Sequence, residues 1–295
     1  MKCYKAHIVP GSAFITVMKG DTLFGQMCWA IAYRDGDMVL RALLEGYTEN
    51  SPFLVVSDPM APGFLPKPTL PAVLSGEDPE LKKLNRKKIW MSLDALRRGD
   101  YLEAVTAKTA KFEPREELSV HNAVNYKTSR TGDGFDPFGV EEIRYTPFEI
   151  YLLIDEERWS PESCRDTLRA VGEAGYGKKA TTGRGRFDVV SFEEAELPCE
   201  GRDFMALAPM VVEGCDAVEI FYDTFVRFGK HGADDARPNP FKKPVLMAQT
   251  GAVLRFESDA KRPFAGKGVG GISAKRPETV HQGYAITVAI PEVRK

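Results

Sequence analysis

Long apolar runs are missing from this sequence, and so is a secretory signal at its beginning. No stretch approaches the roughly 18 apolar residues that a membrane-spanning helix needs. The first residues, MKCYKAH, lack the apolar core of a signal peptide. We therefore expect a cytoplasmic protein with no membrane partner.

Paired cysteines and clustered carboxylates are also missing. The five cysteines are widely spaced, their number is odd, and no Cys-x-x-Cys pair occurs. This argues against a disulfide framework and against a structural zinc site, and favours buried free thiols. Asp133 with Asp136, and Asp234 with Asp235, lie close to glycines, where aspartates are common turn residues. We predict neither a metal site nor a cofactor.

An excess of positive charge is the third absence, since the net charge is −2. A free-standing nucleic-acid-binding protein is usually basic, so any RNA site must be a local patch. Two basic clusters exist, at 82–98 and 178–186. The first could equally be the solvated face of a helix. The second contains no acid.

The elements expected from hydrophobic periodicity repeat one order. Strand 2–9, helix 22–33 and strand 53–57 open the chain. From about 145, strand 148–154, a helix capped by Ser160-Pro161 and strand 187–192 follow. This order predicts an α+β fold of two ferredoxin-like (RRM-like) βαββαβ domains. We place them at 1–140 and 141–295.

Other segments of the chain give weaker structural signals. Residues 79–109 predict one or two helices, which carry the first basic cluster. Residues 113–140 are polar and glycine-rich, and are either disordered or a functional protrusion. Further strands are expected at 204–212, 218–228, 245–256 and 284–290.

The segment Gly175–Phe187 is the strongest candidate site, and we name it the Gly-rich loop. Glycines let a backbone approach a ligand and can point N–H groups at an anion. Cationic side chains and threonine hydroxyls add phosphate contacts. The loop fits neither a Walker motif nor a dinucleotide fingerprint, because it precedes a strand. The alternative is a flexible turn with solvated charges.

The segment His121–Gly132 is the second candidate site. It mixes an aromatic residue, cations and small hydroxyls, a composition suited to stacking on bases and gripping a strand. A disordered loop is the alternative. A metal-free ribonuclease could use a histidine as acid or base, and the histidines are His7, His121, His231 and His281. Their spacing brings no two of them together predictably.

Short motifs in a fixed order resemble the RAMP superfamily of CRISPR proteins. The first are Gly20-Asp-Thr-Leu-Phe-Gly25 before a helix and Gly183-Arg-Gly-Arg-Phe187. The others are Val55-Val-Ser-Asp58 with Phe64-Leu-Pro-Lys-Pro68, His121-Asn122 with Lys127-Thr128 and Thr131-Gly132, Phe241-Lys-Lys-Pro-Val-Leu-Met247, and His281-Gln-Gly-Tyr-Ala-Ile286. Together they resemble the Cas5-like fourth subunit of the type III-A (Csm) effector complex, across nearly the whole chain. Type III-B and type I Cas5-like subunits share much of this pattern.

The resemblance implies a non-catalytic subunit that holds the repeat-derived 5′ handle of the crRNA. It implies docking to the large polymerase/nuclease subunit and to a backbone RAMP subunit, and a protruding thumb after the first domain. RNA-binding roles carry over to Ser12, Lys19, His121, Asn122, Tyr126, Lys127, Arg130, Lys178, Lys179, Gly183, Arg184, Gly185, Arg186, His281 and Gln282. Two alternatives remain open: a metal-independent ribonuclease that processes repeat RNA, and a protein-interaction subunit without RNA contact.

Overall fold

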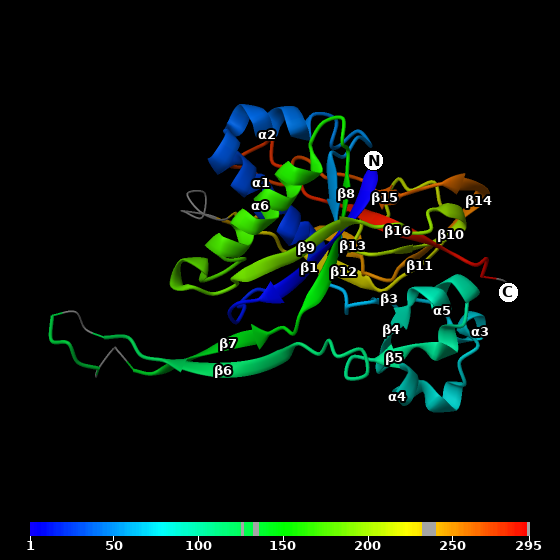
Figure 1. The fold of residues 1–295 in the computed structure, drawn as a ribbon, viewed down its shortest axis with the longest axis horizontal. Helices are drawn as coiled ribbons and strands as arrows, with labels where there is room; N and C mark the ends of the chain where they lie inside the picture. Colours follow the sequence, from blue (N-terminus) through cyan, green and yellow to red (C-terminus); the bar gives the residue numbers. More distant parts are fainter. Residues whose placement is uncertain (125–126, 132–135, 232–239, 294–295) are drawn as a thin grey trace.

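The computed structural model describes residues 1–124, 127–131, 136–231 and 240–293. Its first sheet is antiparallel with strand order β2-β8-β1-β9. Helices α1 and α6 pack on it, and α2 (Asp37–Leu44) lies beside α1 (Figure 1). The elements in chain order are β1 (Lys2–Pro10), α1 (Gly20–Asp35), β2 (Leu54–Val56), β8 (Phe148–Ile154), α6 (Pro161–Ala174) and β9 (Phe187–Glu194).

Local signals explain why α6 forms where the sequence predicts it. The hydroxyl of Ser160 accepts a hydrogen bond from the N–H of Ser163 at 3.1 Å, and Pro161 occupies the first turn. Cys164 and Leu168 lie one turn apart on the buried face. The cap and the apolar spacing therefore act together, as the sequence predicts.

The first sheet joins segments that the sequence assigned to separate domains. Strand β8 pairs with β1 along its length, from Lys2 opposite Ile154 to Ile8 opposite Phe148. The two strand–helix–strand segments thus form one βαββαβ unit with the ferredoxin-like strand order. The expected boundary between 140 and 141 falls inside strand β7 (Phe138–Arg144). The difference arises because strand pairing across 140 or more residues leaves no local trace in the sequence.

A long insertion separates β2 from β8 and has two parts. The first is a small sheet, β3-β4-β5, with short helices around it. The sequence predicts one or two helices over 79–109, but the middle of this segment is the strand β4, in which Trp90 and Met91 are buried. The elements are β3 (Phe64–Pro66), α3 (Ala72–Ser75), η1 (Pro79–Leu81), α4 (Lys82–Asn85), β4 (Lys88–Ser92), α5 (Leu93–Arg98), η2 (Tyr101–Glu103) and β5 (Val105–Thr106).

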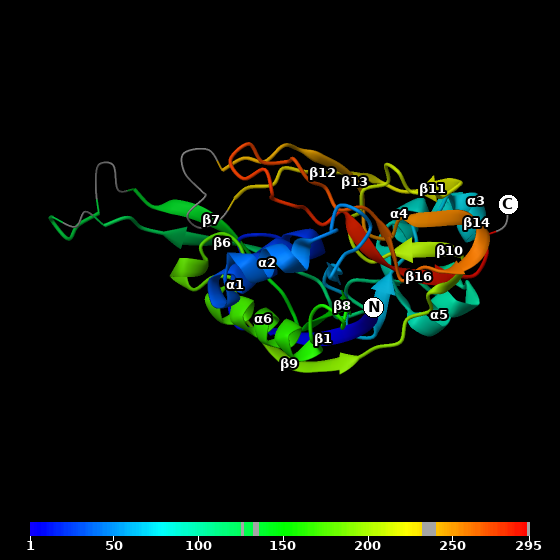
Figure 2. The same ribbon diagram turned by 90° about the horizontal axis from the view of Figure 1, so that it is seen from above.

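The second part of the insertion is a two-stranded hairpin. Strands β6 (Arg115–His121) and β7 pair from Arg115 opposite Arg144 to His121 opposite Phe138. The hairpin projects away from the body of the molecule in both views (Figures 1 and 2). Of the two alternatives for 113–140, the described residues therefore form a protrusion.

The rest of the chain forms a second sheet of strand order β11-β14-β10-β16-β15, and a separate ribbon of β12 and β13. No helix follows η3 (Ala180–Thr182) in the part of the chain that the structure describes. The second strand–helix–strand order predicted from sequence thus belongs to the first sheet. The strands are β10 (Glu200–Ala206), β11 (Glu219–Phe221), β12 (Thr224–Arg227), β13 (Val245–Ala248), β14 (Val253–Lys261), β15 (Phe264–Gly266) and β16 (Tyr284–Ile290).

One apolar core joins the two sheets. Tyr284 and Ile286 of β16 belong to the same buried cluster as β1, β2 and β8. The Tyr284 hydroxyl donates a 2.7 Å hydrogen bond to the carbonyl of Tyr47. None of the described helices is long and apolar enough to span a membrane.

Candidate nucleic-acid interface

The Gly-rich loop follows α6 and has a defined backbone conformation. Gly175, Gly177, Gly183 and Gly185 all have positive φ, as does Lys179. Positive φ is easily adopted only by glycine. The four glycines therefore let the chain make successive turns within a few residues.

The loop is anchored from the inside by one aromatic ring. Tyr176 is fully buried, and its N–H donates to the carbonyl of Gly185 at 2.8 Å. Its hydroxyl donates to the carbonyl of Val17 at 3.1 Å and accepts from the N–H of Lys19 at 3.3 Å. A Cβ on Gly185 would come within 2.1 Å of the Tyr176 carbonyl oxygen. This close approach requires glycine at position 185.

The segment between β1 and α1 holds the outer side of the loop. Ser12 accepts a 2.9 Å hydrogen bond from the N–H of Arg186, and Thr16 accepts one of 3.0 Å from the N–H of Lys178. Ser12 was expected to face RNA, and the structure uses its hydroxyl to fix the loop. Hydrogen bonds to the segment between β1 and α1 thus fix the backbone of the Gly-rich loop, unlike that of a solvated flexible turn.

The N–H groups in the second half of the loop are used within the protein. Those of Thr182, Gly183, Arg184, Gly185 and Arg186 each donate to a protein oxygen. The expected cradle of N–H groups around an anion is therefore not formed in this half. Any phosphate contact here must come from side chains.

The four cations of the loop have different environments. Lys178 and Arg186 are exposed, and neither forms an ion pair within the described residues. Lys179 lies over the ring of Phe138, with 5.4 Å from Nζ to the centroid. Arg184 points its Nη2 at Oε1 of Glu142, 2.6 Å away. Lys178 and Arg186 are thus the two charges most open to a phosphate.

The contacts of Lys179 and Arg184 bring the loop against the base of the β6–β7 hairpin. Glu142 in β7 is 3% exposed, and His121 Nε2 lies 3.5 Å from the same Oε1 that Arg184 contacts. His121 stacks on Phe138, with ring centroids 5.8 Å apart. The two candidate sites predicted from sequence therefore form one continuous surface.

The remaining residues of the hairpin candidate lie toward its tip. Asn122, Lys127 and Arg130 are exposed. Tyr126 lies outside the described residues. These side chains extend the surface away from the body, as a protruding thumb requires.

Two other residues expected to bind RNA, Lys19 and Gln282, have partners inside the protein. Lys19 pairs with Asp58, 2.6 Å from Nζ to Oδ2. Gln282 is fully buried, and its side-chain amide bonds both the N–H and the carbonyl of Val56, at 2.9 and 2.8 Å. The Gln282 side chain therefore makes the hydrogen bonds that the backbone of a neighbouring strand would make with the edge strand β2. It does not face solvent.

His281 belongs to a buried charge cluster that the sequence did not predict. Asp21 at the start of α1 accepts two hydrogen bonds from Arg227, at 2.6 and 2.7 Å, and His281 Nε2 is 3.3 Å from its Oδ2. Burial alone would raise the pKa of Asp21, but the His281 hydrogen bond and the Arg227 charge lower it to about 2. The cluster links the first sheet's helix to β12.

The two other histidines, His231 and His7, also have neighbours within the fold. His231 Nε2 is 2.7 Å from the Ser273 hydroxyl and is buried. His7 lies in β1 opposite Glu149 and Ser191. No group of three His, Cys, Asp or Glu side chains suited to a metal occurs among the residues that the structure describes.

Sequence reasoning missed Glu142, Asp58 and Thr16, whose partners lie far away in the chain. Asp58 closes the quoted motif Val55-Val-Ser-Asp58, but no local signal marks its partner or the other two residues. Tyr176 could have been found, because a lone aromatic between two glycines is a natural anchor for a loop.

No protein-family model and no curated protein matches the chain. Solved structures do match it over its whole length. A Csm1–Csm4 cassette in complex with AMPPNP is 15% identical with a TM-score of 0.63, covering 100% of both chains. A Csm1–Csm4 cassette with cA4 is 17% identical with a TM-score of 0.61, covering 98% of this chain and 99% of that one.

A third match has a different partner in its assembly. It is a Csm3–Csm4 subcomplex of the type III-A CRISPR-Cas interference complex, 14% identical with a TM-score of 0.61, covering 99% of this chain and 100% of that one. Csm4 is the subunit that these structures share. The chain therefore has a Csm4-like fold over its full length, which confirms the resemblance predicted from its motifs at the level of fold.

Proposed function

We propose that this chain is a crRNA-binding subunit of a type III CRISPR effector complex and holds the repeat-derived 5′ handle. The observation that carries the proposal is the surface formed by the Gly-rich loop and the β6–β7 hairpin. On it, Lys178 and Arg186 are exposed without ion pairs among the described residues, on a backbone fixed by Tyr176. Exposed cations on a fixed backbone suit phosphate contacts, which set the position of an RNA strand.

The hairpin supports the proposal by its shape. A two-stranded ribbon is marginally stable alone, and this one is held at its base by Arg184 and Glu142. We infer that it is the thumb and that Asn122, Lys127 and Arg130 meet RNA beyond the handle.

Two protein partners belong to the same proposal. The chain matches, along its full length, a fold found with Csm1 in one assembly and with Csm3 in another. We infer docking to a large polymerase/nuclease subunit and to a backbone RAMP subunit. Co-purification of the tagged chain with each partner from the same genome tests this inference.

Charge reversal tests the RNA contact. The variant carrying Lys178→Glu and Arg186→Glu should bind a synthetic RNA with the repeat-derived 5′ segment at least about tenfold more weakly, because two phosphate contacts are replaced by repulsion. The matched control is Lys83→Glu with Lys87→Glu, which changes the net charge equally on exposed positions of the insertion. Equal losses of RNA affinity in both variants would mean that only the net charge matters, and would contradict an RNA-binding site at Lys178 and Arg186.

We also propose that the chain binds RNA without cleaving it. His121 contacts the same buried carboxylate, Glu142, as Arg184 of the Gly-rich loop, with its Nε2 3.5 Å from Oε1. Incubation with repeat RNA in the absence of metal should leave the RNA intact. Specific cleavage that disappears in His121→Ala would instead establish the ribonuclease alternative.

A further inference from the structure

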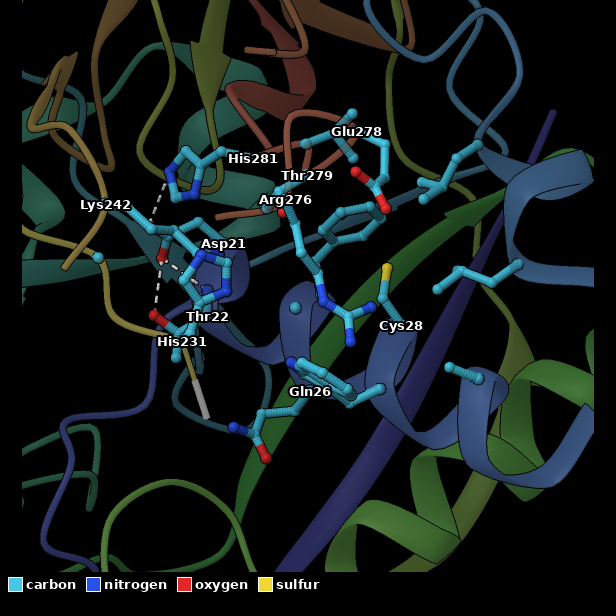
Figure 3. A pocket seen from close by; sticks show the side chains of 18 of the residues that line it. Asp21, Thr22, Gln26, Cys28, His231, Lys242, Arg276, Glu278, Thr279 and His281 are labelled. Atoms are coloured by element: carbon cyan, nitrogen blue, oxygen red, sulfur yellow. Dashed lines mark hydrogen bonds and ion pairs between the residues drawn. The ribbon is translucent and has the colours of Figure 1, made fainter. Parts of the chain in front are cut away.

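A cavity of about 620 Å³ opens beside the start of α1, on the side away from the first sheet's strands. Figure 3 shows its lining side chains. Helices α1 and α2 form one wall, the ribbon that continues β12 and β13 forms the second, and residues 276–281 form the third. Its volume lies in the range of small-ligand sites. Three of the short motifs quoted from the sequence contribute to its lining, through Asp21 and Thr22, Lys242, and His281.

Lys242 gives the cavity an unsatisfied positive charge. Its ammonium forms no ion pair within the described part of the chain, and burial lowers its pKa. The nearby carboxylate of Asp21, on the α1 wall, already pairs with Arg227 and His281. An anion that enters the cavity would meet a partly buried ammonium that has no direct ion-pair partner among the described residues.

The opposite wall offers an aromatic surface. The ring of Trp29 stacks on Tyr33, with centroids 5.6 Å apart, and the guanidinium of Arg276 lies 5.4 Å from the Trp29 centroid. Leu40 and Val280 line the cavity next to it. An aromatic ring beside apolar side chains and a guanidinium plane is the surface on which unpaired bases stack.

The cavity is adjacent to the Gly-rich loop. Tyr176 of the loop bonds the N–H of Lys19, and Thr22, three residues later, lines the cavity. Three residues of helix span about 4.5 Å. The buried anchor of the loop and the cavity therefore meet at the start of α1.

We propose that this cavity takes one extruded nucleotide of the RNA bound at the Gly-rich loop, with its base on Trp29 and its phosphate at Lys242. The proposal rests on the proposed RNA-binding function and assigns it a second, base-accepting site. The combined aromatic and cationic walls favour a nucleotide over an acidic protein segment, which would leave the Trp29 surface unused.

The test uses the full chain and synthetic RNAs of the repeat-derived 5′ segment, each with one abasic position. Wild-type affinity should fall about tenfold or more at one position, because base stacking on an aromatic ring is worth about 1–3 kcal/mol. In Trp29→Ala, the same abasic position should cause no further loss of affinity, because the aromatic partner of that base is already absent. This comparison is a double-mutant cycle on one contact. A flat abasic profile, or a loss that persists in Trp29→Ala, would overturn the cavity site.

A second variant keeps the test independent of any folding defect in Trp29→Ala. Lys242→Met should weaken RNA binding about fivefold or more, whereas Lys243→Met, an exposed neighbour that does not line the cavity, should stay within about twofold. Equal effects of the two would contradict the phosphate position. Failure of wild-type chain to bind any of these RNAs would instead remove the proposed function, on which this site depends.

Discussion

Arg184 and Glu142 lie in contact, with 2.6 Å between Nη2 and Oε1, although they belong to segments about 40 residues apart. Glu142 is 3% exposed, whereas 27% of the Arg184 side chain reaches solvent. The contact fixes the Gly-rich loop against the hairpin strand β7. The position of one half of the proposed RNA surface thus depends on the other half.

The first prediction is an asymmetric loss of stability when this pair is broken. Arg184→Met removes the 2.6 Å ion-pair partner of a buried carboxylate and should cost about 3 kcal/mol of unfolding free energy. Glu142→Gln leaves a guanidinium that can turn to water and should cost about 1 kcal/mol. Urea unfolding at neutral pH measures both. Equal losses of unfolding free energy in the two variants would mean that the Arg184–Glu142 contact is not formed by the protein in solution.

The second prediction separates backbone strain from steric conflict in the Gly-rich loop. Gly183 and Gly185 both have positive φ, 83° and 74°, but a Cβ on Gly183 meets nothing within 4 Å. Gly183→Ala should therefore cost only the left-handed strain, about 1 kcal/mol. Gly185→Ala adds the conflict with the Tyr176 carbonyl and should cost about 3 kcal/mol.

Urea unfolding also measures this pair of variants. Gly183→Ala serves as the matched control, because it shares the backbone conformation and lacks the close approach. A similar loss in both would show that the loop opens at Tyr176 in solution.

The first sheet shows which parts of a fold the sequence can predict. Strands β1 and β8 and helix α6 have local signals, namely apolar runs and a cap at Ser160, and the predictions there are confirmed. The pairing of β8 with β1 depends on residues more than 140 positions apart, so two units were predicted where the structure has one sheet. Local sequence signals indicate where a strand or helix forms, but not which strand it pairs with.

The same limit applies to the candidate site. The glycines and cations of the Gly-rich loop mark it clearly, and the structure leaves Lys178 and Arg186 exposed. Sequence could not separate these from Arg184, whose partner Glu142 is distant in the chain, nor show that Gln282 bonds the backbone of Val56. Motif membership named candidate residues, but it could not tell which of them have partners within the fold and which are open to a ligand.

The third prediction concerns the salt dependence of RNA binding. Each phosphate contact to a single strand contributes about −0.7 to the slope of log affinity against log salt. The variant with Lys178→Gln and Arg186→Gln should therefore bind with a slope smaller by about 1.4. Fluorescence anisotropy from low to moderate salt measures it, with Lys83→Gln and Lys87→Gln as the control pair. An unchanged slope in the loop variant would place these two charges away from phosphate.

The fourth prediction concerns acid stability and rests on Asp21. Its pKa is lowered from 3.8 to about 2 by His281 and Arg227, against the opposing effect of burial. A lowered folded-state pKa stabilises the fold above the unfolded value, and this contribution disappears as the pH falls from about 4 to about 2. Asp21→Asn should remove about 2 kcal/mol at pH 7 and flatten the pH profile of unfolding free energy in that window.

Urea unfolding at a series of pH values between 7 and 2 measures the Asp21 effect. Asp37→Asn is the control, because Asp37 is an exposed acid at the start of α2 and near the same cavity. That variant should keep the wild-type slope below pH 4. If Asp21→Asn kept the slope as well, the carboxylate of Asp21 would gain nothing from Arg227 and His281, and the link between α1 and β12 would have to depend on apolar contacts alone.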